Sequence, residues 1–426
     1  LCQELGIPLE QAHTALSDAQ ATAELFLCMR QKMFQLPKGL LERLLSLSDS
    51  LLYESYMVIE EVYQKQSLLV EHDLVEVQGL FLRKEKSALS PRKLSKDFQT
   101  NIALLGLEER NLQERFAQKV QECLQGETIS FIQAQTGIGK TYGYLLPALS
   151  LEHEEGILLS VPTKILQNQV MQEDAKRLEE IFHISTHSLK GPQNYLKLDA
   201  FHATLEEEES NRLYTRFKMQ LLVWLTETDT GDLDEIGQLY RYQQFLPNLV
   251  HDGNLHKDSL FWLEDFWRRG QDKARSCKLL VTNHAYLLTR LEDDPSLLEG
   301  RLLILDEAQK ILLTLENLSQ KSFLLNDLVD QLDHIMAQES GMLQRRLMES
   351  IRFELCHLMD QFLSGKRRMC PSTTMKQLRQ DFSELDMPIL HEYQKFFCSD
   401  GEFWLSASEF SSKKIEISSS RHQRLL

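Results

Sequence analysis

The sequence lacks paired cysteines and long uncharged apolar runs. Its seven cysteines are odd in number, lie far apart and include no CxxC pair, so a disulfide scaffold is excluded and a reducing compartment is predicted. No apolar stretch approaches the roughly 20 residues that a membrane-spanning helix needs, and no signal peptide opens the chain. These absences predict a cytoplasmic protein without a membrane partner.

The sequence also lacks an excess of positive charge. Its formal net charge is -16, so no global basic character marks a nucleic-acid-binding protein, although a local basic groove would still serve. Of the 426 residues, 42% are hydrophobic and 26% are charged, which is typical of globular proteins with roughly two to four domains. The first residue is Leu1 and not methionine, so we expect a fragment of a longer chain.

Apolar segments typical of strands alternate with helical patterns in the middle of the chain. Strands are predicted near residues 128–134, 156–161, 278–282 and 301–305, and helices at 109–125 and from about 140 to 151. This alternation predicts an α/β fold with a parallel sheet that helices cover. The segment from Leu302 to Leu305 is apolar throughout, which predicts a strand buried on both faces at the centre of the sheet.

A phosphate-binding loop follows the first predicted strand. Residues 134–141 read AQTGIGKT and match the P-loop pattern, except that Ala134 replaces its first glycine. Gly137 and Gly139 permit positive φ, so consecutive N–H groups can point at phosphate oxygens beside a helix N-terminus. Lys140 would reach the β- and γ-phosphates, and Thr141 would ligate Mg²⁺. The predicted nucleotide-binding residues of the loop are Ala134, Gln135, Thr136, Gly137, Ile138, Gly139, Lys140 and Thr141.

Two adjacent carboxylates, Asp306 and Glu307, follow the strand that ends at Leu305. Ligands bind at the carboxyl ends of strands in open α/β sheets, so Asp306 is predicted to complete the Mg²⁺ coordination and Glu307 to orient or deprotonate a water. The alternative is a solvated acidic turn, which the presence of the phosphate loop makes the weaker interpretation. Roughly 165 residues separate the two motifs, which predicts an insertion at about residues 190–277.

The flanking segments are predicted to be mainly helical. Residues 9–33 and 37–80 show helical spacing of apolar residues, and a basic stretch with Ser-Pro at 90 and 91 indicates a linker. We therefore expect a helical connector at 37–104. Residues 311–400 show the same helical spacing without a strand signal, which predicts an all-helical domain.

Six segments together resemble superfamily 2 DNA helicases of the XPD/DinG group. They are RNLQ (110–113), AQTGIGKT (134–141), VPTKILQNQV (161–170), LKGPQNYL (189–196), VTNHAYLL (281–288) and LDEAQ (305–309). The resemblance implies a RecA-like P-loop domain at 105–310, an inserted helical arch domain at 311–400 and a return to the motor domain at 401–426. The second RecA-like domain of such helicases would then be missing.

The resemblance also implies residue roles. The glutamine of the upstream motif contacts adenine in this family, which assigns Gln113, with Arg110 at the start of the motif, to the nucleotide. The segment 161–170 resembles the one that touches the backbone of single-stranded DNA, which places Thr163 and Gln167 near nucleic acid.

Two departures from the family pattern carry consequences. The acidic box usually ends in histidine, whereas Gln309 stands there. Since that last residue couples nucleotide state to motion in the family, the change is expected to affect this coupling and not nucleotide binding. Iron-sulfur members place four cysteines between the phosphate loop and the acidic box. Here Lys197 occupies the place of the first and Cys277 is the sole cysteine of the interval, so no iron-sulfur cluster is predicted.

The N-terminal segment HTALSDAQATAELF (13–26) resembles the last motif of DnaQ-like, DEDDh-type 3'-5' exonucleases. The resemblance implies that His13 is a general base and Asp18 a metal ligand; the alternative is a histidine at a helix start and an aspartate N-cap. Residues 1–36 would be the end of an exonuclease domain, in the layout of the DnaQ-DinG fusion proteins of Gram-positive bacteria. The earlier exonuclease motifs are not present, and two-metal chemistry needs their carboxylates as well.

Taken together, these segments predict an ATP-dependent and Mg²⁺-dependent helicase or translocase on single-stranded DNA, 5'-3' by resemblance, coupled to a 3'-5' exonuclease. The alternative function is an ATP-sensing DNA-binding regulator of the attached exonuclease that does not unwind DNA. The sequence predicts neither the preferred DNA structure nor the oligomeric state.

Overall fold

A computed structural model describes residues 14–51, 55–66, 73–85, 90–126, 128–151, 156–207, 210–254, 256–293, 295–337, 341–362, 368–399, 401–408 and 411–420. The chain divides into two compact units, Leu1–Asp306 and Glu307–Leu426. The first unit contains the phosphate loop. No helix of the described residues is long and apolar enough to cross a membrane.

The helices of the first unit are α1 (Ala15–Met33), α2 (Lys38–Leu47), α3 (Met57–Lys65), α4 (Phe98–Leu104), α5 (Asn111–Leu124), α6 (Lys140–Ser150), α7 (Lys164–Gln169), α8 (Lys176–Phe182), α9 (Leu198–Leu205), α10 (Arg212–Trp224), α11 (Phe266–Ser276) and α12 (His284–Asp293). Its strands are β1 (Leu74–Val77), β2 (Leu80–Arg83), β3 (Ile157–Val161), β4 (Thr186–Ser188), β5 (Leu279–Asn283) and β6 (Leu302–Leu305). The predicted helices near 9–33, 109–125 and 140–151 are confirmed as α1, α5 and α6.

The central sheet of the first unit has four parallel strands in the order β4-β5-β3-β6. The predicted α/β class is therefore confirmed, and three of the predicted strands appear as β3, β5 and β6. The prediction that β6 is buried on both faces is wrong. Among the described strands β6 pairs with β3 alone, so it forms an edge at which Leu303 and Leu305 remain 37% and 36% exposed.

The strand predicted at 128–134 is not formed. Residues 128–135 have no regular secondary structure, and Ile129 and Phe131 are each 89% exposed. An apolar, β-branched stretch becomes a strand only where another strand pairs with it, and local sequence does not contain that information.

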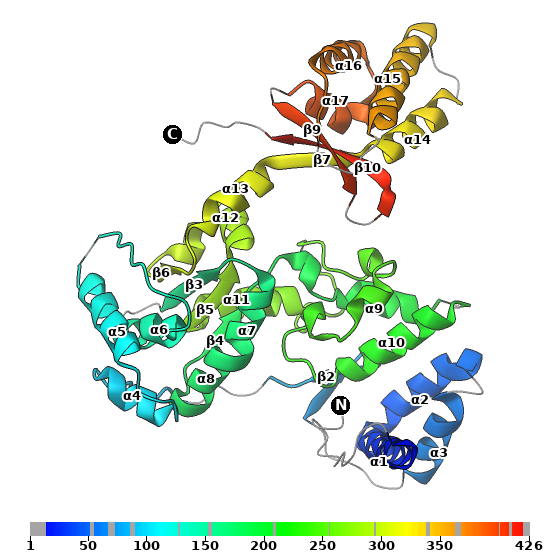
Figure 1. The fold of residues 1–426 in the computed structure, drawn as a ribbon. Helices are drawn as coiled ribbons and strands as arrows, with labels where there is room; N and C mark the ends of the chain where they lie inside the picture. Colours follow the sequence, from blue (N-terminus) through cyan, green and yellow to red (C-terminus); the bar gives the residue numbers. More distant parts are fainter. Residues whose placement is uncertain are drawn as a thin grey trace. The chain divides into compact units, whose positions relative to one another are not determined.

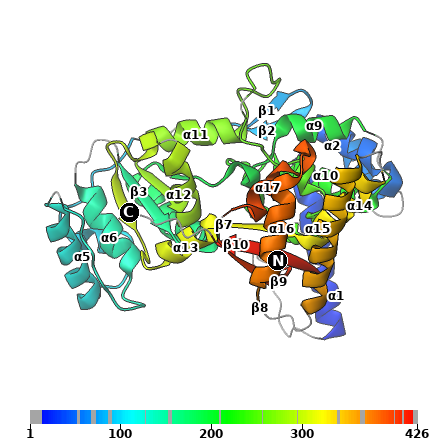
Figure 2. The same cartoon turned by 90° about the horizontal axis from the view of Figure 1, so that it is seen from above.

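Helices cover both faces of the central sheet because alternate residues of its strands face opposite sides. Leu158 and Leu280 contribute to a core that includes α11 and α12. Leu159 and Val281 contribute to a second core that includes α4, α5, α6 and α8. Figures 1 and 2 both show α5 and α6 side by side next to this sheet. The phosphate loop precedes α6, so this second core fixes the position of the loop.

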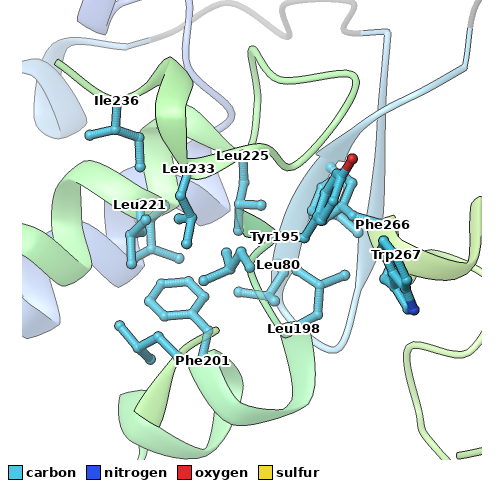
Figure 3. Close-up of a cluster of buried hydrophobic side chains, with 14 of the residues drawn as sticks. Leu80, Tyr195, Leu198, Phe201, Leu221, Leu225, Leu233, Ile236, Phe266 and Trp267 are labelled. Carbon is cyan, nitrogen blue, oxygen red and sulfur yellow. The ribbon is translucent and has the colours of Figure 1, made fainter. Parts of the chain in front are cut away.

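The N-terminal connector and the predicted insertion share one hydrophobic core. Figure 3 shows Leu80 of β2 among Leu198, Leu221 and Leu225. Residues 74–83, predicted as helix and linker, instead form the antiparallel hairpin β1–β2. Both turn residues, Gln78 and Gly79, have positive φ (49° and 74°), as a two-residue hairpin turn of this twist requires.

A charge cluster surrounds the buried Lys190 in the insertion. The Lys190 side chain is completely buried, and its Nζ lies 2.5 Å from Asp232 Oδ2 and 2.8 Å from Asp234 Oδ2. Burial raises the pKa of Asp232, and the positive charge of Lys190 opposes that effect. A charge removed from water in this way is stable only while its partners remain in place.

The second unit is mixed, not all-helical. Its helices are α13 (Lys310–Ser319), α14 (Leu325–Met336), α15 (Met342–Gln361), α16 (Ser372–Glu384) and α17 (His391–Phe397), and its strands are β7 (Gln320–Leu324), β8 (Arg368–Met369), β9 (Glu402–Ser408) and β10 (Ser411–Ser420). These strands form an antiparallel sheet in the order β7-β10-β9-β8. The prediction of an all-helical 311–400 is therefore wrong, and the described part of 401–426 pairs within this unit.

Candidate nucleotide-binding site

The phosphate loop adopts the backbone conformation that its glycines predict. Gly137 has φ 82° and Gly139 has φ 83°, and Gly139 lies at the N-cap of α6 in the left-handed region. Lys140 is the first residue of α6, and Thr141 is the second. A glycine in the left-handed conformation just before a helix lets successive backbone N–H groups point to one place. The dipole of the helix favours an anion at that same place. The residues present therefore fit a bound phosphate.

The RNLQ segment lies against this loop. Gln113 is buried on α5, and its Nε2 donates a 2.8 Å hydrogen bond to the carbonyl oxygen of Gly139. A Cβ atom at position 139 would lie 2.3 Å from that nitrogen, so a side chain there would displace the end of Gln113, in addition to the cost of the positive φ. Arg110 Nη1 lies 3.5 Å from the carbonyl oxygen of Gly137. Both predicted nucleotide residues of this segment thus neighbour the loop, and their contact with adenine stays a prediction.

Tyr144 connects the phosphate loop with the acidic box. Its hydroxyl group lies 3.3 Å from Asp306 Oδ2 and also forms a hydrogen bond with the Thr141 side chain. Burial raises the pKa of Tyr144 well above its usual value, and the charge of Asp306 raises it further. The two predicted Mg²⁺ ligands, Thr141 and Asp306, therefore share one hydrogen-bonding neighbour. This arrangement suits an ion that takes few protein ligands and several waters and phosphate oxygens.

The acidic box itself forms the turn between β6 and α13. Asp306 is held there by its backbone N–H, which donates a 2.9 Å hydrogen bond to the carbonyl oxygen of Ser160 on β3. Glu307 has a positive φ of 47°, which is uncommon for a residue with a side chain. Its carboxylate lies 2.6 Å from Lys310 Nζ. The role of Glu307 toward water stays a prediction.

The two predicted DNA-contacting residues lie in different environments. Thr163 is exposed at the N-cap of α7, where its Oγ1 accepts a hydrogen bond from the backbone N–H of Leu166. Gln167 is completely buried, and its amide group is bonded to Asn283 and to the segment at Ser188. The prediction that Gln167 contacts nucleic acid is therefore corrected: its side chain supports α7 from within the fold.

The exonuclease prediction falls partly outside the described residues, because His13 is not among them. Asp18 lies in the first turn of α1 and is exposed. The N-cap of α1 is Thr14, so the alternative in which Asp18 caps the helix is wrong. Among the described residues, no group of three or more His, Cys, Asp or Glu side chains is arranged to hold a metal ion.

Sequence reasoning missed Tyr144 as a part of the site, and it missed Ser160, Asn283 and His284 as buried residues that support the elements around the site without contacting the nucleotide. Tyr144 lies three residues after Thr141, a spacing that places both side chains on one face of a helix, so the pattern contained a usable signal. Asn283 and His284 belong to the VTNHAYLL segment, but the pattern gave them no role. Ser160 lies inside an apolar strand, and only tertiary structure shows its partner.

Comparison with known proteins gives results of three kinds. Residues 111–226 match the DEAD/DEAH box helicase family. The 3'-5' exonuclease DinG of Staphylococcus saprophyticus is 31% identical over 327 residues, covering 73% of this chain and 35% of that protein. The protein of the same name from Staphylococcus aureus (strain USA300) is 30% identical over 305 residues, covering 68% of this chain and 33% of its own length.

A solved structure of truncated XPD aligns with a TM-score of 0.35 at 13% identity, covering 71% of this chain and 85% of that one. This similarity is too low to bear on the fold. The chain spans about a third of the length of the curated relatives that it matches. On the family match and these relatives, the chain belongs to the DinG-like DEAD/DEAH box helicases related to the staphylococcal 3'-5' exonuclease DinG.

Proposed function

We propose that this chain is part of an ATP-dependent helicase or translocase that moves 5'-3' on single-stranded DNA and is coupled to a 3'-5' exonuclease. The observation that carries the proposal is the placement of Thr141 and Asp306 around the Tyr144 hydroxyl group, beside a loop shaped for phosphate. The names of the staphylococcal relatives support the exonuclease part of the proposal.

Each residue of the site has a defined task in this proposal. The N–H groups at Gly137 to Thr141 hold the phosphates, and Lys140 offsets their negative charge. Thr141 and Asp306 position Mg²⁺, which when bound neutralises charge on the transferred phosphoryl group. Glu307 orients or deprotonates the attacking water, and it must first release Lys310, because the two side chains form an ion pair.

The geometry of the sheet supports a nearby DNA contact. Strands β3 and β6 are parallel neighbours, with Ser160 in register with Leu305. The turn at Thr163 after β3 and Asp306 after β6 therefore lie at the same edge of the sheet. DNA bound at the exposed Thr163 would lie on the same side of the domain as the nucleotide, which suits a motor that links hydrolysis to strand movement.

The second unit begins within the acidic box, at Glu307, which supports its interpretation as an arch-like insertion. Its mixed α/β structure differs from the helical arch expected from the sequence. Motors of this kind use two RecA-like domains. We propose that the longer protein supplies the second one.

A second candidate function is an ATP-sensing DNA-binding regulator of the attached exonuclease. Two features favour it. Gln309 replaces the usual histidine of the acidic box, and Glu307 is paired with Lys310 instead of being free to act on water. A regulator would bind ATP tightly and hydrolyse it slowly or not at all.

The deciding experiment measures ATP turnover of the full-length protein with and without single-stranded DNA. Lys140→Ala removes the phosphate-binding charge, and Lys119→Ala is a matched control because Lys119 is an exposed residue of α5 paired with Glu122. A motor shows DNA-stimulated turnover that Lys140→Ala abolishes and Lys119→Ala retains. Tight ATP binding without turnover would identify the regulator. Unwinding of a 5'-tailed duplex but not a 3'-tailed one tests the direction.

A further inference from the structure

A series of buried polar groups leads away from the acidic box. The backbone N–H of Asp306 donates a 2.9 Å hydrogen bond to the carbonyl oxygen of Ser160. Ser160 Oγ lies 2.7 Å from His284 Nδ1. The residue before His284 is Asn283, whose Oδ1 accepts a 3.0 Å hydrogen bond from the backbone N–H of Tyr286. The start of α12 is thus linked to the strand that supports the acidic box.

Asn283 connects this series to Gln167. Its Nδ2 donates a 2.9 Å hydrogen bond to Gln167 Oε1. Gln167 Nε2 in turn lies 2.9 Å from Ser188 Oγ and 3.1 Å from the carbonyl oxygens of Leu189 and Val281. Both ends of the Gln167 amide are therefore used within the fold, and strands β4 and β5 are held to α7 by one side chain.

The series ends at the exposed turn before α7. The backbone N–H of Gln167 donates a 3.0 Å hydrogen bond to the carbonyl oxygen of Thr163, which is the N-cap of this six-residue helix. A displacement of Gln167 therefore moves the turn on which Thr163 lies.

Packing alone does not account for these side chains. Ser160, Gln167 and His284 are completely buried, and Asn283 is 5% exposed. Apolar side chains of similar size would fill the same space without the cost of removing amide and hydroxyl groups from water. A buried polar network that satisfies its members fixes one relative position of the elements that it joins. Here those elements are the strand beside Asp306 and the helix that begins at Thr163.

We propose that Gln167 and Asn283 are positioning residues that couple the nucleotide site at Asp306 to the DNA-contacting turn at Thr163. This inference rests on the proposed function, since it requires that the protein bind both ATP and single-stranded DNA. A shift of Asp306 on nucleotide binding moves Ser160 and His284, and the Asn283–Gln167 hydrogen bond passes the movement to α7. The two side chains act through other residues and touch neither ligand.

Such coupling has a thermodynamic definition. If ATP changes the affinity for DNA by some factor, DNA changes the affinity for ATP by the same factor. The quantity to measure is the ratio of the dissociation constants of a fluorescent oligothymidylate, with and without a non-hydrolysable ATP analogue and Mg²⁺, on the full-length protein. A purely structural role would lower stability and leave this ratio unchanged.

Asn283→Ser is the most selective variant. Serine is a good N-cap residue, so it keeps an acceptor for the backbone N–H of Tyr286 at the start of α12. It is too short to reach Gln167 and so removes the hydrogen bond between the Asn283 and Gln167 side chains, while the hydrogen bond from Gln167 Nε2 to the carbonyl oxygen of Val281 remains. Ser160→Ala interrupts the series at a different point, the contact with His284.

Thr282→Val is the matched control. Thr282 is the neighbour of Asn283 on β5, it is completely buried, and its Oγ1 donates a 2.9 Å hydrogen bond to the carbonyl oxygen of Leu189. Valine has nearly the same shape, so this variant removes one buried hydrogen bond in the same place and leaves the Asn283–Gln167 bond intact. It therefore measures how much the loss of any buried hydrogen bond in this region changes the ratio of DNA affinities.

We expect Asn283→Ser to bring the ratio of DNA affinities at least about threefold closer to one, with unchanged affinity for the ATP analogue in the absence of DNA. Thr282→Val should keep the ratio of the unchanged protein. An unchanged ratio in Asn283→Ser, or an equal loss in Thr282→Val, would overturn the inference. If Asn283→Ser does not fold, Ser160→Ala decides by the same criteria. A ratio of one in the unchanged protein would instead overturn the proposed motor, and the inference with it.

Discussion

The hydroxyl group of Tyr144 lies 3.3 Å from Asp306 Oδ2, although 162 positions of the chain separate the two residues. The same hydroxyl forms a hydrogen bond with Thr141, the second residue of α6. A single side chain therefore contacts both of the residues predicted to ligate Mg²⁺, Thr141 at the end of the phosphate loop and Asp306 in the acidic box. Tyr144 lies about one helical turn beyond the loop, so the geometry of α6 directs its side chain towards Asp306.

Tyr144→Phe should weaken the binding of ATP in the presence of Mg²⁺ by about fivefold, the loss expected for one hydrogen bond of about 1 kcal/mol. Binding of ATP in excess chelator should not change, because Asp306 then has no ion to hold. Titration calorimetry under both conditions measures the difference. Tyr142→Phe is the control, since the Tyr142 hydroxyl is bonded to Asp174. An equal loss with and without Mg²⁺ would contradict the assigned role.

The two loop glycines should respond differently to alanine. Gly137 and Gly139 have almost the same positive φ, which costs about 1 kcal/mol for a residue with a side chain. Nothing lies within 4 Å of a Cβ at Gly137, whereas at Gly139 the Cβ would lie 2.3 Å from Gln113 Nε2. We expect Gly139→Ala to lower the unfolding free energy by about 1–3 kcal/mol more than Gly137→Ala does. Chemical denaturation measures both values.

Adding Gln113→Ala tests the cause of this difference. The double variant has room for the new methyl group but keeps the unfavourable φ. It should therefore regain part of the extra loss and unfold with a free energy between those of Gly139→Ala and Gly137→Ala, because Gln113→Ala also removes the hydrogen bond to the carbonyl oxygen of Gly139. If Gly139→Ala is no worse than Gly137→Ala, the contact with Gln113 is not tight in solution.

Features with strong local signals were predictable from the sequence. The loop from Ala134 to Thr141 is one contiguous pattern, and the strand preceding Asp306 is a run of four apolar residues. Helix α5 buries Gln113, Ala117 and Val120 at spacings of four and three, which the helical period reveals. These signals sufficed for the α/β class and for the phosphate loop, whereas Gln113 was assigned to the nucleotide by the family resemblance.

Features that depend on distant partners were not predictable. Strand β7 pairs with β10 at Phe323 and Ile417, so its strand conformation is decided by residues far away in the chain. The series of buried polar groups was not predictable either, because the burial of Gln167 depends on β4 and β5 and not on its neighbours in the sequence. Pattern reasoning placed Gln167 near DNA by resemblance, and only burial showed that its side chain faces the interior.

Lys190→Met should be strongly destabilising. It leaves the buried Asp232 without the charge that offsets its burial, and also removes the partner of the more exposed Asp234, at a cost of about 3–5 kcal/mol. Lys197→Met is the matched control, since its partner Asp252 is 45% exposed at the side chain and such pairs contribute about 1 kcal/mol or less. Melting temperatures of the two variants compare these effects. Similar small losses in both variants would mean that the Lys190 cluster is solvated.

Adding Asp232→Asn to Lys190→Met should recover part of the stability. Removing one carboxylate lowers the uncompensated negative charge that the first substitution leaves behind. Asp232 is the appropriate choice because burial raises the pKa of this carboxyl group already in the unchanged protein. No recovery would indicate that the loss comes from the volume of the lysine side chain and not from its charge.

His187 on β4 should make the protein sensitive to mild acid. Burial, together with the positive charge of Lys273, lowers the pKa of this imidazole from 6.5 to about 4. The folded protein therefore holds the neutral ring, while the unfolded chain takes up a proton already near pH 6.5. The stabilisation is present above pH 6.5 and is lost as the pH falls towards 4, and it amounts to at most about 3 kcal/mol.

His187→Leu should remove this part of the pH dependence, because leucine does not take up a proton and is equally suited to the buried position on β4. The measurement is the difference in melting temperature between pH 7.5 and pH 4.5, which we expect to be smaller in His187→Leu than in the unchanged protein. His256→Leu is the control, since His256 is exposed and its replacement should leave the difference as it is. If His187→Leu melts with the full difference of the unchanged protein, acid sensitivity arises from other groups and His187 is hydrated in the folded state.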